Sequence, residues 1–331
     1  MADTDAAAPP VTRPSLAVDP GFASPHTPED WPIAAAMLQF AGTTAGGSPV
    51  TGQPAEVWRA LLQPAVDAGY TAIELASNWV RAGDLDSARR AELKDVLADA
   101  GLAPVSVAVP RESILNRDAD KAAAALAFSH RSIDAAAELG APIVCFGLHD
   151  VLTPEQKAVQ WFWTVPGDPG PADAETRAKA IREYRELADH AESLGLEISI
   201  EMYEEGFLSS GAASVDFLDE IGSSAAGLNP DLGNLVRHQG PIEPWEHTAA
   251  QVLPRTNYWH VKNYSRLENP AAGVVLTHPS TLATGIIDYR RGVHYAIAHG
   301  FSGAFVVEHY GGDGLSVGAE NERYLRSILP R

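Results

Sequence analysis

One segment shows the repeating unit of the chain most clearly: Leu187-Ala-Asp-His-Ala-Glu-Ser-Leu-Gly195-Leu-Glu-Ile198-Ser-Ile-Glu201-Met202. A helical pattern that covers Ala174–Leu194 stops at Gly195, as helices commonly do at a glycine. The run Ile198–Met202 follows and reads as continuous rather than alternating, which predicts a strand buried on both faces. Glu201 lies at the end of this run, so we expect a carboxylate at the carboxyl end of the strand.

The same unit recurs along the chain. Three more helical patterns end at a glycine shortly before a strand, namely Ala55–Ala68, Ser87–Ala100 and Ala119–Leu139. Eight strand-like runs are found: Ala35–Gln39, Ala72–Ala76, Val105–Val109, Ile143–Gly147, Ile198–Met202, Gly227–Pro230, Tyr258–Val261 and Ala304–Val307. This alternation predicts an α/β fold whose parallel strands close into a single (β/α)8 TIM barrel. An open doubly wound sheet is the alternative, but no Gly-x-Gly-x-x-Gly follows the first run, which argues against a dinucleotide-binding version.

The domain organisation follows from where this rhythm begins and where it breaks. Residues 31–331 are predicted to form one barrel domain, and residues 1–30, rich in Ala, Pro, Asp and Thr, a flexible N-terminal arm. Two insertions, Asp150–Asp173 and Leu267–Thr284, follow the fourth and seventh strands and therefore fall on the carboxyl-terminal face, where barrel active sites are built. Trp161 and Trp163 in the first insertion shape a pocket, face a partner or only pack a long loop; the sequence leaves these alternatives open.

Charge and composition exclude several classes of partner. The formal net charge is −19, and no Lys/Arg cluster offers a footprint for phosphates, so we expect no nucleic-acid partner. No apolar run approaches the length of a membrane span, and the N-terminus lacks the pattern of a secretory signal. Cys145, the only cysteine, lies in an apolar run and is expected to be a buried hydrophobe rather than a nucleophile. The absence of any internal disulfide suits a cytoplasmic protein.

Four consecutive strand ends each carry an acidic or imidazole side chain: Glu201, Asp231, His260 and Glu308. In a closed barrel these positions converge, and three buried carboxylates need a compensating cation. The set predicts one divalent ion: Mn²⁺, Mg²⁺ or Co²⁺, with Zn²⁺ also compatible. The alternatives are separate ion pairs with Lys262, Arg237 and Arg266, or a metal-free carboxylate pair of the glycosidase kind.

Two further residues are candidates for proton chemistry at this mouth. His149 ends the fourth strand, and an imidazole of ordinary pKa suits proton abstraction at neutral pH; a loop histidine that is merely hydrogen-bonded is the alternative. Lys262 lies two residues after His260, hence on the same face, where it would stabilise an enolate oxygen or balance the negative charge. His309 points to the opposite side of its strand from Glu308 and is expected to be a packing residue.

The four strand-end residues, together with His260-Val-Lys-Asn263 and Gly285-Ile-Ile-Asp288-Tyr289, resemble the sugar-phosphate isomerase/epimerase superfamily of xylose isomerase-like barrels over about residues 33–331. The resemblance implies that Glu201, Asp231, His260 and Glu308 hold one divalent ion, Mn²⁺ first, and that a pair of metal-bound carboxylates shuttles the proton. The chain departs from many members at Asn234, where they have His, and at Asn263, where they have Asp. The missing His argues against the DNA-repair endonucleases of this superfamily and puts the usual epimerase contacts in doubt.

A narrower resemblance rests on Trp259-His-Val-Lys-Asn-Tyr264, on Glu308-His-Tyr-Gly-Gly-Asp313 and on the aromatic insertion. These are similar to the catalytic α subunit of C-glycoside deglycosidases, which implies elimination on a 3-keto C-glycoside and a complex with a smaller β subunit. We therefore expect an oligomer that removes a proton next to a keto-sugar carbonyl, with His149, Glu201 or Glu308 as the base and Lys262 assisting. Epimerisation or isomerisation is the alternative, and a non-catalytic sugar-binding subunit is the alternative of another class.

Overall fold

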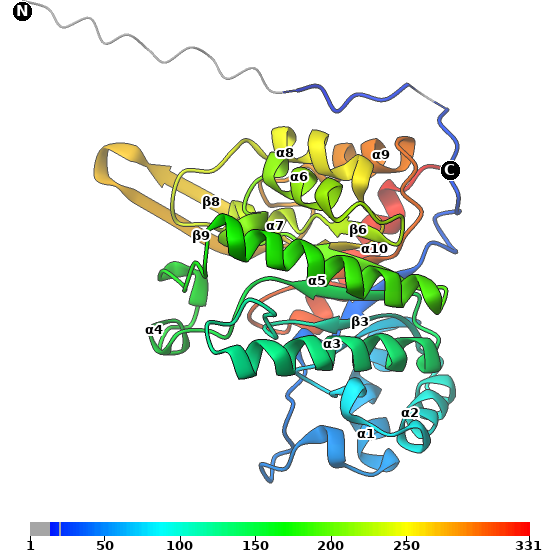
Figure 1. Cartoon of the computed structure of the whole chain (residues 1–331). Coiled ribbons are helices and arrows are strands. Elements are labelled where there is room, and N and C mark those ends of the chain that lie inside the picture. The colour runs from blue at the N-terminus through cyan, green and yellow to red at the C-terminus, as the bar shows by residue number, and fades with distance from the viewer. Residues whose placement is uncertain (1–13, 20) are drawn as a thin grey trace, which may run out of the picture.

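The computed structural model describes residues 14–19 and 21–331 and shows eight parallel strands in a nearly closed barrel surrounded by helices (Figure 1). The predicted α/β barrel is therefore confirmed. The barrel strands are β1 (Ile33–Ala36), β2 (Ala72–Ala76), β3 (Ala103–Val109), β4 (Ile143–Gly147), β5 (Glu197–Glu201), β6 (Ala226–Asn229), β7 (Trp259–Val261) and β10 (Phe305–Val307). They pair in the order β6-β5-β4-β3-β2-β1-β10-β7.

The helices pack outside this ring and bury their apolar faces against it. They are α1 (Ala55–Asp67), α2 (Ser87–Asp99), α3 (Ala119–Leu139), α5 (Ala174–Ser193), α6 (Gly211–Ile221), α7 (Leu232–Val236), α8 (Trp245–Val252), α9 (Tyr289–Ala298) and α10 (Gly314–Ile328), with a single turn α4 (Pro154–Lys157). The α3 helix begins where Asp118 accepts hydrogen bonds from backbone amides and ends at Gly140, whose φ of 82° is left-handed. Local signals of this kind placed the ends of the four predicted helices, α1, α2, α3 and α5, within one residue of the observed ends.

The first strand lies earlier than the run Ala35–Gln39 predicted. The β1 strand spans Ile33–Ala36, because these residues pair with Phe305–Val307 of β10 and with β2. The chain then turns through a short 3-10 helix at Met37–Gln39, so the second half of the predicted strand was wrong. Pairing with the last strand of the chain, which closes the barrel, determines this boundary.

The ring is least tightly paired between β6 and β7. Among the described residues, these two strands lack a ladder, and an isolated bridge links Leu228 of β6 to Thr256, which precedes β7. A side chain compensates in part, because the His260 amide donates to Asn229 Oδ1 at 2.8 Å. Asn229 is fully buried, so this bond replaces a backbone partner that the open ladder does not supply.

Both insertions lie at the same end of the molecule (Figure 1). The first contains α4 and a 3-10 turn at Phe162–Thr164, and the second is an antiparallel hairpin of β8 (Asn263–Asn269) and β9 (Val274–Ser280). They are joined where Trp163 Nε1 donates to Thr277 Oγ1 at 3.0 Å. Leu267 and Leu276 on the hairpin are well exposed, so its far end offers an apolar surface.

The N-terminal segment is described only in part. Residues 1–13 and 20 of the predicted arm lie outside the described residues. Of the rest, Leu16 is buried in the core and His26 Nε2 lies 3.2 Å from Ser302 O. Arg326 Nη1 near the C-terminus donates to Pro28 O at 2.7 Å, so this part of the segment packs against the last helix.

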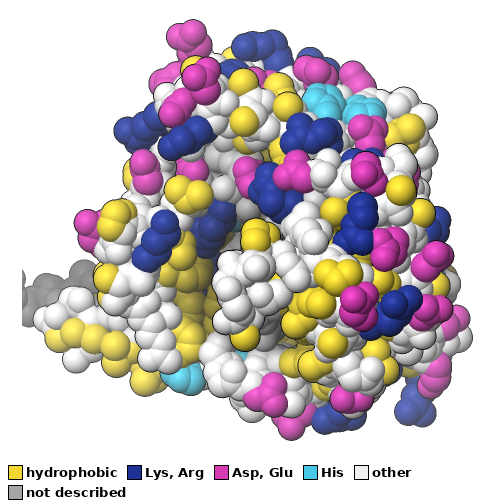
Figure 2. All heavy atoms as spheres, turned by 90° about the horizontal axis from the view of Figure 1, so that it is seen from below, with side chains coloured by type: hydrophobic (Ala, Val, Ile, Leu, Met, Phe, Trp, Pro, Cys, Tyr) yellow, Lys and Arg dark blue, Asp and Glu magenta, His cyan; other side chains and the backbone are white. Residues whose placement is uncertain are grey.

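None of the helices in residues 14–19 and 21–331 is both long enough and apolar enough to span a bilayer. On the face seen in Figure 2, Lys and Arg side chains are interspersed with Asp and Glu and do not gather into one basic patch.

Candidate metal centre

The four predicted ligands converge at the carboxyl ends of their strands. Glu201 is the last residue of β5, Asp231 is the N-cap of α7 just after β6, His260 is on β7, and Glu308 directly follows β10. Each offers one ligand atom, and these atoms all lie within 4.8 Å of one another. All four residues are buried. Closure of the barrel thus brings together residues that are up to 107 positions apart in the sequence.

A buried carboxylate that sequence reasoning missed orients His260. Glu74 is on β2, and its Oε2 lies 2.7 Å from His260 Nε2. The same oxygen also accepts a hydrogen bond from the Tyr258 hydroxyl. Since a carboxylate only accepts, Nε2 carries a hydrogen, and this contact turns Nδ1 inward, 3.4 Å from Glu201 Oε1. The available signal was an acidic residue inside the otherwise apolar strand Ala72–Ala76.

The other ligands are held in the same manner. Asp231 Oδ1 accepts from the Asn234 amide at 3.1 Å, and Asn234 Nδ2 donates to Glu201 Oε1 at 3.0 Å. His260 Nδ1 and Glu308 Oε1 are buried and have no hydrogen-bond partner among the residues that the structure describes. Three carboxylates and one imidazole, two of which have buried atoms without a partner, fit a divalent ion that prefers oxygen ligands.

Lys262 contributes the cationic side chain nearest to this centre. Its Nζ lies 2.8 Å from Asp231 Oδ2 and 2.9 Å from Glu308 Oε2. The alternative of ion pairs is therefore realised for two of the three carboxylates, but through one shared lysine. Of the other two cations considered, Arg237 pairs with Glu204 and Arg266 with Glu268.

The electrostatics of the centre favour added positive charge. Burial, and then the charges of Glu308 and Glu201, raise the pKa of Asp231 to about 7, although Lys262 opposes this. Burial alone would lower the pKa of His260, but Glu74 and Glu201 raise it well above its usual value. The pKa of Glu201 is lowered despite its burial, chiefly by the contact with His260. A proton and a divalent ion would therefore compete for the same inward-facing atoms.

His149 lies beside the centre but differs from the expected base of ordinary pKa. Its ring stacks on Tyr203 with centroids 4.3 Å apart and an interplanar angle of 14°. Burial lowers the pKa of His149 to about 3, although the Glu201 charge opposes this. The expectation of an unperturbed imidazole was wrong, because the ring packs against Tyr203 and its Nδ1 is buried without a hydrogen-bond partner among the described residues; the lowered pKa makes the ring neutral at neutral pH.

An aromatic cluster covers the mouth around Arg237. The guanidinium is fully buried, forms two hydrogen bonds with Glu204, and lies 4.7 Å from the Phe162 ring centroid and 5.7 Å from that of Tyr310. Trp163 is buried in this cluster, stacked on Trp161 at 5.1 Å. Trp163 therefore packs the insertion onto the barrel mouth.

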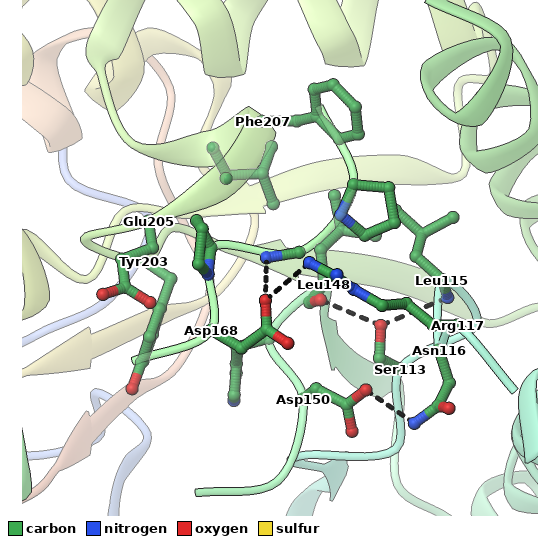
Figure 3. Close-up of a pocket in the computed structure, with 16 residues that line it drawn as sticks. Ser113, Leu115, Asn116, Arg117, Leu148, Asp150, Asp168, Tyr203, Glu205 and Phe207 are labelled. Atoms are coloured by element: carbon green, nitrogen blue, oxygen red, sulfur yellow. Dashed lines mark hydrogen bonds and ion pairs between the residues drawn. The ribbon is translucent and has the colours of Figure 1, made fainter. Parts of the chain in front are cut away.

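Two cavities meet at His149 and Tyr203, which line both. The inner one, lined by three of the four ligands, Glu201, His260 and Glu308, measures about 30 Å³, enough for an ion and water but not for a sugar ring. The outer one measures about 240 Å³ and lies between the loops that follow β3, β4 and β5 (Figure 3). Its wall is mixed, with apolar Leu148 and Phe207 and acidic Asp150, Asp168 and Glu205.

A parallel barrel that gathers three carboxylates and an imidazole at the carboxyl ends of its strands defines the class: a (β/α)8 barrel with its candidate site at the usual face. The chain belongs to the xylose isomerase-like TIM barrel family, whose model matches residues 62–328. The predicted superfamily is therefore confirmed.

Solved structures extend this comparison. A xylose isomerase-like TIM barrel protein from Mycobacterium smegmatis, solved in complex with magnesium, is 40% identical, with a TM-score of 0.87 over 92% of this chain and 98% of that one. D-allulose 3-epimerase from Methylomonas sp. is 17% identical, with a TM-score of 0.63 over 93% and 99% of the two chains. L-ribulose 3-epimerase is 16% identical, with a TM-score of 0.59 over 90% and 94%. These two show a shared fold. No curated protein matches the sequence significantly.

Proposed function

We propose that this chain is a divalent-metal-dependent enzyme that removes a proton from the carbon next to the carbonyl of a keto-sugar. The observation that carries the proposal is the convergence of four buried ligand atoms within 4.8 Å. The magnesium complex of the 40% identical relative supports a divalent ion, with Mn²⁺ as the proposed alternative to Mg²⁺. When bound, the ion would act as a Lewis acid and stabilise negative charge on the sugar oxygens.

The residues of the chain supply the proton chemistry around that charge. Glu201 is held by Asn234 and Glu308 by Lys262, so each carboxylate has a fixed orientation. We assign the base to one of these two carboxylates, because both belong to the set of converging ligand atoms, whereas the His149 ring stacks on Tyr203 beside that set. Lys262 Nζ lies where it can donate to an oxygen that becomes negative as the proton leaves.

Return of the proton to the other face or to the neighbouring carbon completes an epimerisation or isomerisation. The D-allulose and L-ribulose 3-epimerases share the fold of this chain, which supports this outcome. A sugar requires His149 or Tyr203 to turn, because the inner cavity of about 30 Å³ is too small for it. Such a movement would join the inner and outer cavities.

Elimination on a 3-keto C-glycoside is the second candidate, and the outer cavity favours it. A space of about 240 Å³ next to the centre offers room for an aryl group attached to the sugar. In this reaction the proton leaves C2, the C1–aryl bond breaks with formation of a C1=C2 double bond, and the aryl carbon takes up a proton. The exposed hairpin residues Leu267 and Leu276 offer a place for the smaller β subunit that this reaction would require in complex.

Incubation in D₂O with free keto-sugars, and separately with a 3-keto C-glycoside, tests the proposal. Deuterium incorporation that stops with chelator and returns with Mn²⁺ or Mg²⁺ supports the shared first step. Released aglycone identifies elimination, and a new sugar epimer or isomer identifies the first candidate. Activity that is indifferent to chelator would contradict the metal assignment. Sugar binding without deuterium exchange, even with a β subunit present, would indicate a non-catalytic binding subunit.

A further inference from the structure

A pair of histidines on the outer helical layer is not used by the proposed reaction. His130 is on α3 and His190 on α5, two helices that run side by side (Figure 1). Their Nδ1 atoms lie 2.9 Å apart, and about a quarter of each side chain is exposed, 27% and 25%. Water or a small ion therefore has access to the pair.

A carboxylate holds the other nitrogen of each ring. His190 Nε2 lies 3.1 Å from Asp134 Oδ1, and His130 Nε2 lies 3.3 Å from Glu186 Oε1. Because a carboxylate accepts and does not donate, each Nε2 carries a hydrogen. A neutral ring with this tautomer has its lone pair on Nδ1, so two lone pairs face each other across 2.9 Å. One positive species between them, a metal ion or a shared proton, removes the repulsion.

We propose that His130 and His190 bind one borderline divalent transition-metal ion, with Zn²⁺ as the reference ion, through their Nδ1 atoms. Zn–N bonds of about 2.0–2.1 Å place two nitrogens 2.9 Å apart at an angle of about 90° at the ion. A tetrahedral Zn²⁺ needs about 3.3 Å between them, so the two rings must move apart by a few tenths of an ångström on binding, and water fills the remaining positions. The carboxylates on Nε2 form the carboxylate–histidine–metal arrangement that orients imidazole ligands. The bound ion links α3 to α5 on the outside of the barrel.

This site differs in ion preference from the candidate centre at the barrel mouth. Two imidazoles suit Zn²⁺, Ni²⁺ or Cu²⁺, whereas three carboxylates and one imidazole also suit Mg²⁺ and Mn²⁺. The proposal does not depend on the reaction at the mouth. The test therefore compares the number of Zn²⁺ ions bound per chain in the wild type and in variants of the histidine pair. This difference is the same whether or not the centre at the barrel mouth also binds Zn²⁺.

The experiment is Zn²⁺ titration of the full chain followed by counting of bound ions per chain. His130→Gln and, separately, His190→Gln are each expected to bind one ion fewer than the wild type. The matched control is His299→Gln, whose exposed ring contacts Tyr295 O and no second histidine among the described residues. Asp134→Asn keeps both ligands and is expected to weaken Zn²⁺ binding at this site on the order of tenfold.

Two outcomes overturn the proposal. An unchanged ion count in both histidine variants means that the pair shares a proton instead of a metal. An equal loss in His299→Gln means that the ions bind to surface histidines without a built site. If His130→Gln fails to fold, as judged by its thermal unfolding, His190→Gln and Asp134→Asn still decide the question.

Discussion

Replacement of Glu74 by Gln tests whether the carboxylate behind His260 determines metal affinity. The variant keeps the shape of the side chain but removes the charge that faces His260 Nε2 at 2.7 Å. A hydrogen bond to a charged group contributes about 1.5–3 kcal/mol and a neutral one about 0.5–1.5 kcal/mol, a difference of about 1–1.5 kcal/mol. We therefore expect the Kd for Mn²⁺ or Mg²⁺ to rise about five- to twelvefold. This is near the lower end of the roughly 10–100-fold loss of metal affinity that is typical when a residue hydrogen-bonded to a metal ligand is replaced.

The assay is calorimetric titration of the metal-stripped chain, with thermal unfolding to confirm that the variant folds. Glu197→Gln is the matched control, because Glu197 begins β5 at the opposite end of the barrel, is exposed and accepts from Asn257 Nδ2 at 2.8 Å. A Kd for Glu74→Gln within about twofold of the wild type, or an equal rise in Glu197→Gln, would refute the reasoning about the second carboxylate.

Three further predictions concern the same centre. Glu308→Gln removes a ligand and should raise the metal Kd by more than the roughly 100-fold upper range of an outer partner; tight binding by this variant in the same titration would contradict the ligand assignment. Because the pKa of Asp231 is raised to about 7 and that of His260 is raised well above its usual value, both ligands must lose a proton to bind the ion, so the Kd should rise by about tenfold or more per unit as pH falls below 7 and should still fall as pH rises above it; a flat Kd from pH 5.5 to 8.5 would exclude this coupling. His149→Ala should keep the metal and retain turnover, because the base is assigned to Glu201 or Glu308 and the lowered pKa of His149, about 3, leaves this ring neutral at pH 6 and pH 8 alike; loss of kcat in a folded variant that still binds metal would show that His149 is the base.

Local sequence signals were sufficient for the barrel and for the convergence of Glu201, Asp231, His260 and Glu308. Each lies at the end of a buried run, and barrel closure alone brings such positions together. The same argument could not predict the role of Glu74, because its contact with His260 joins residues 186 positions apart and depends on the register between strands. Periodicity can place a side chain at a strand end but cannot show which distant carboxylate lies behind it.

The environment of His149 and the form of the second insertion required tertiary structure. The lowered pKa of His149 depends on the Tyr203 ring and on loops far away in sequence, which no property of Phe146-Gly-Leu-His149 reveals. The β8–β9 hairpin has no buried face along much of its length, so its strands lack the apolar pattern that identified the barrel strands.

The weak pairing between β6 and β7 suggests a structural role for the ion in addition to its role in the reaction. Asp231 follows one of these strands and His260 lies on the other, so an ion held by both would fasten the ring where its backbone pairing is weakest. Part of the binding free energy would then stabilise the native state against local opening and proteolysis. Metal supply would set the lifetime of each chain as well as its turnover.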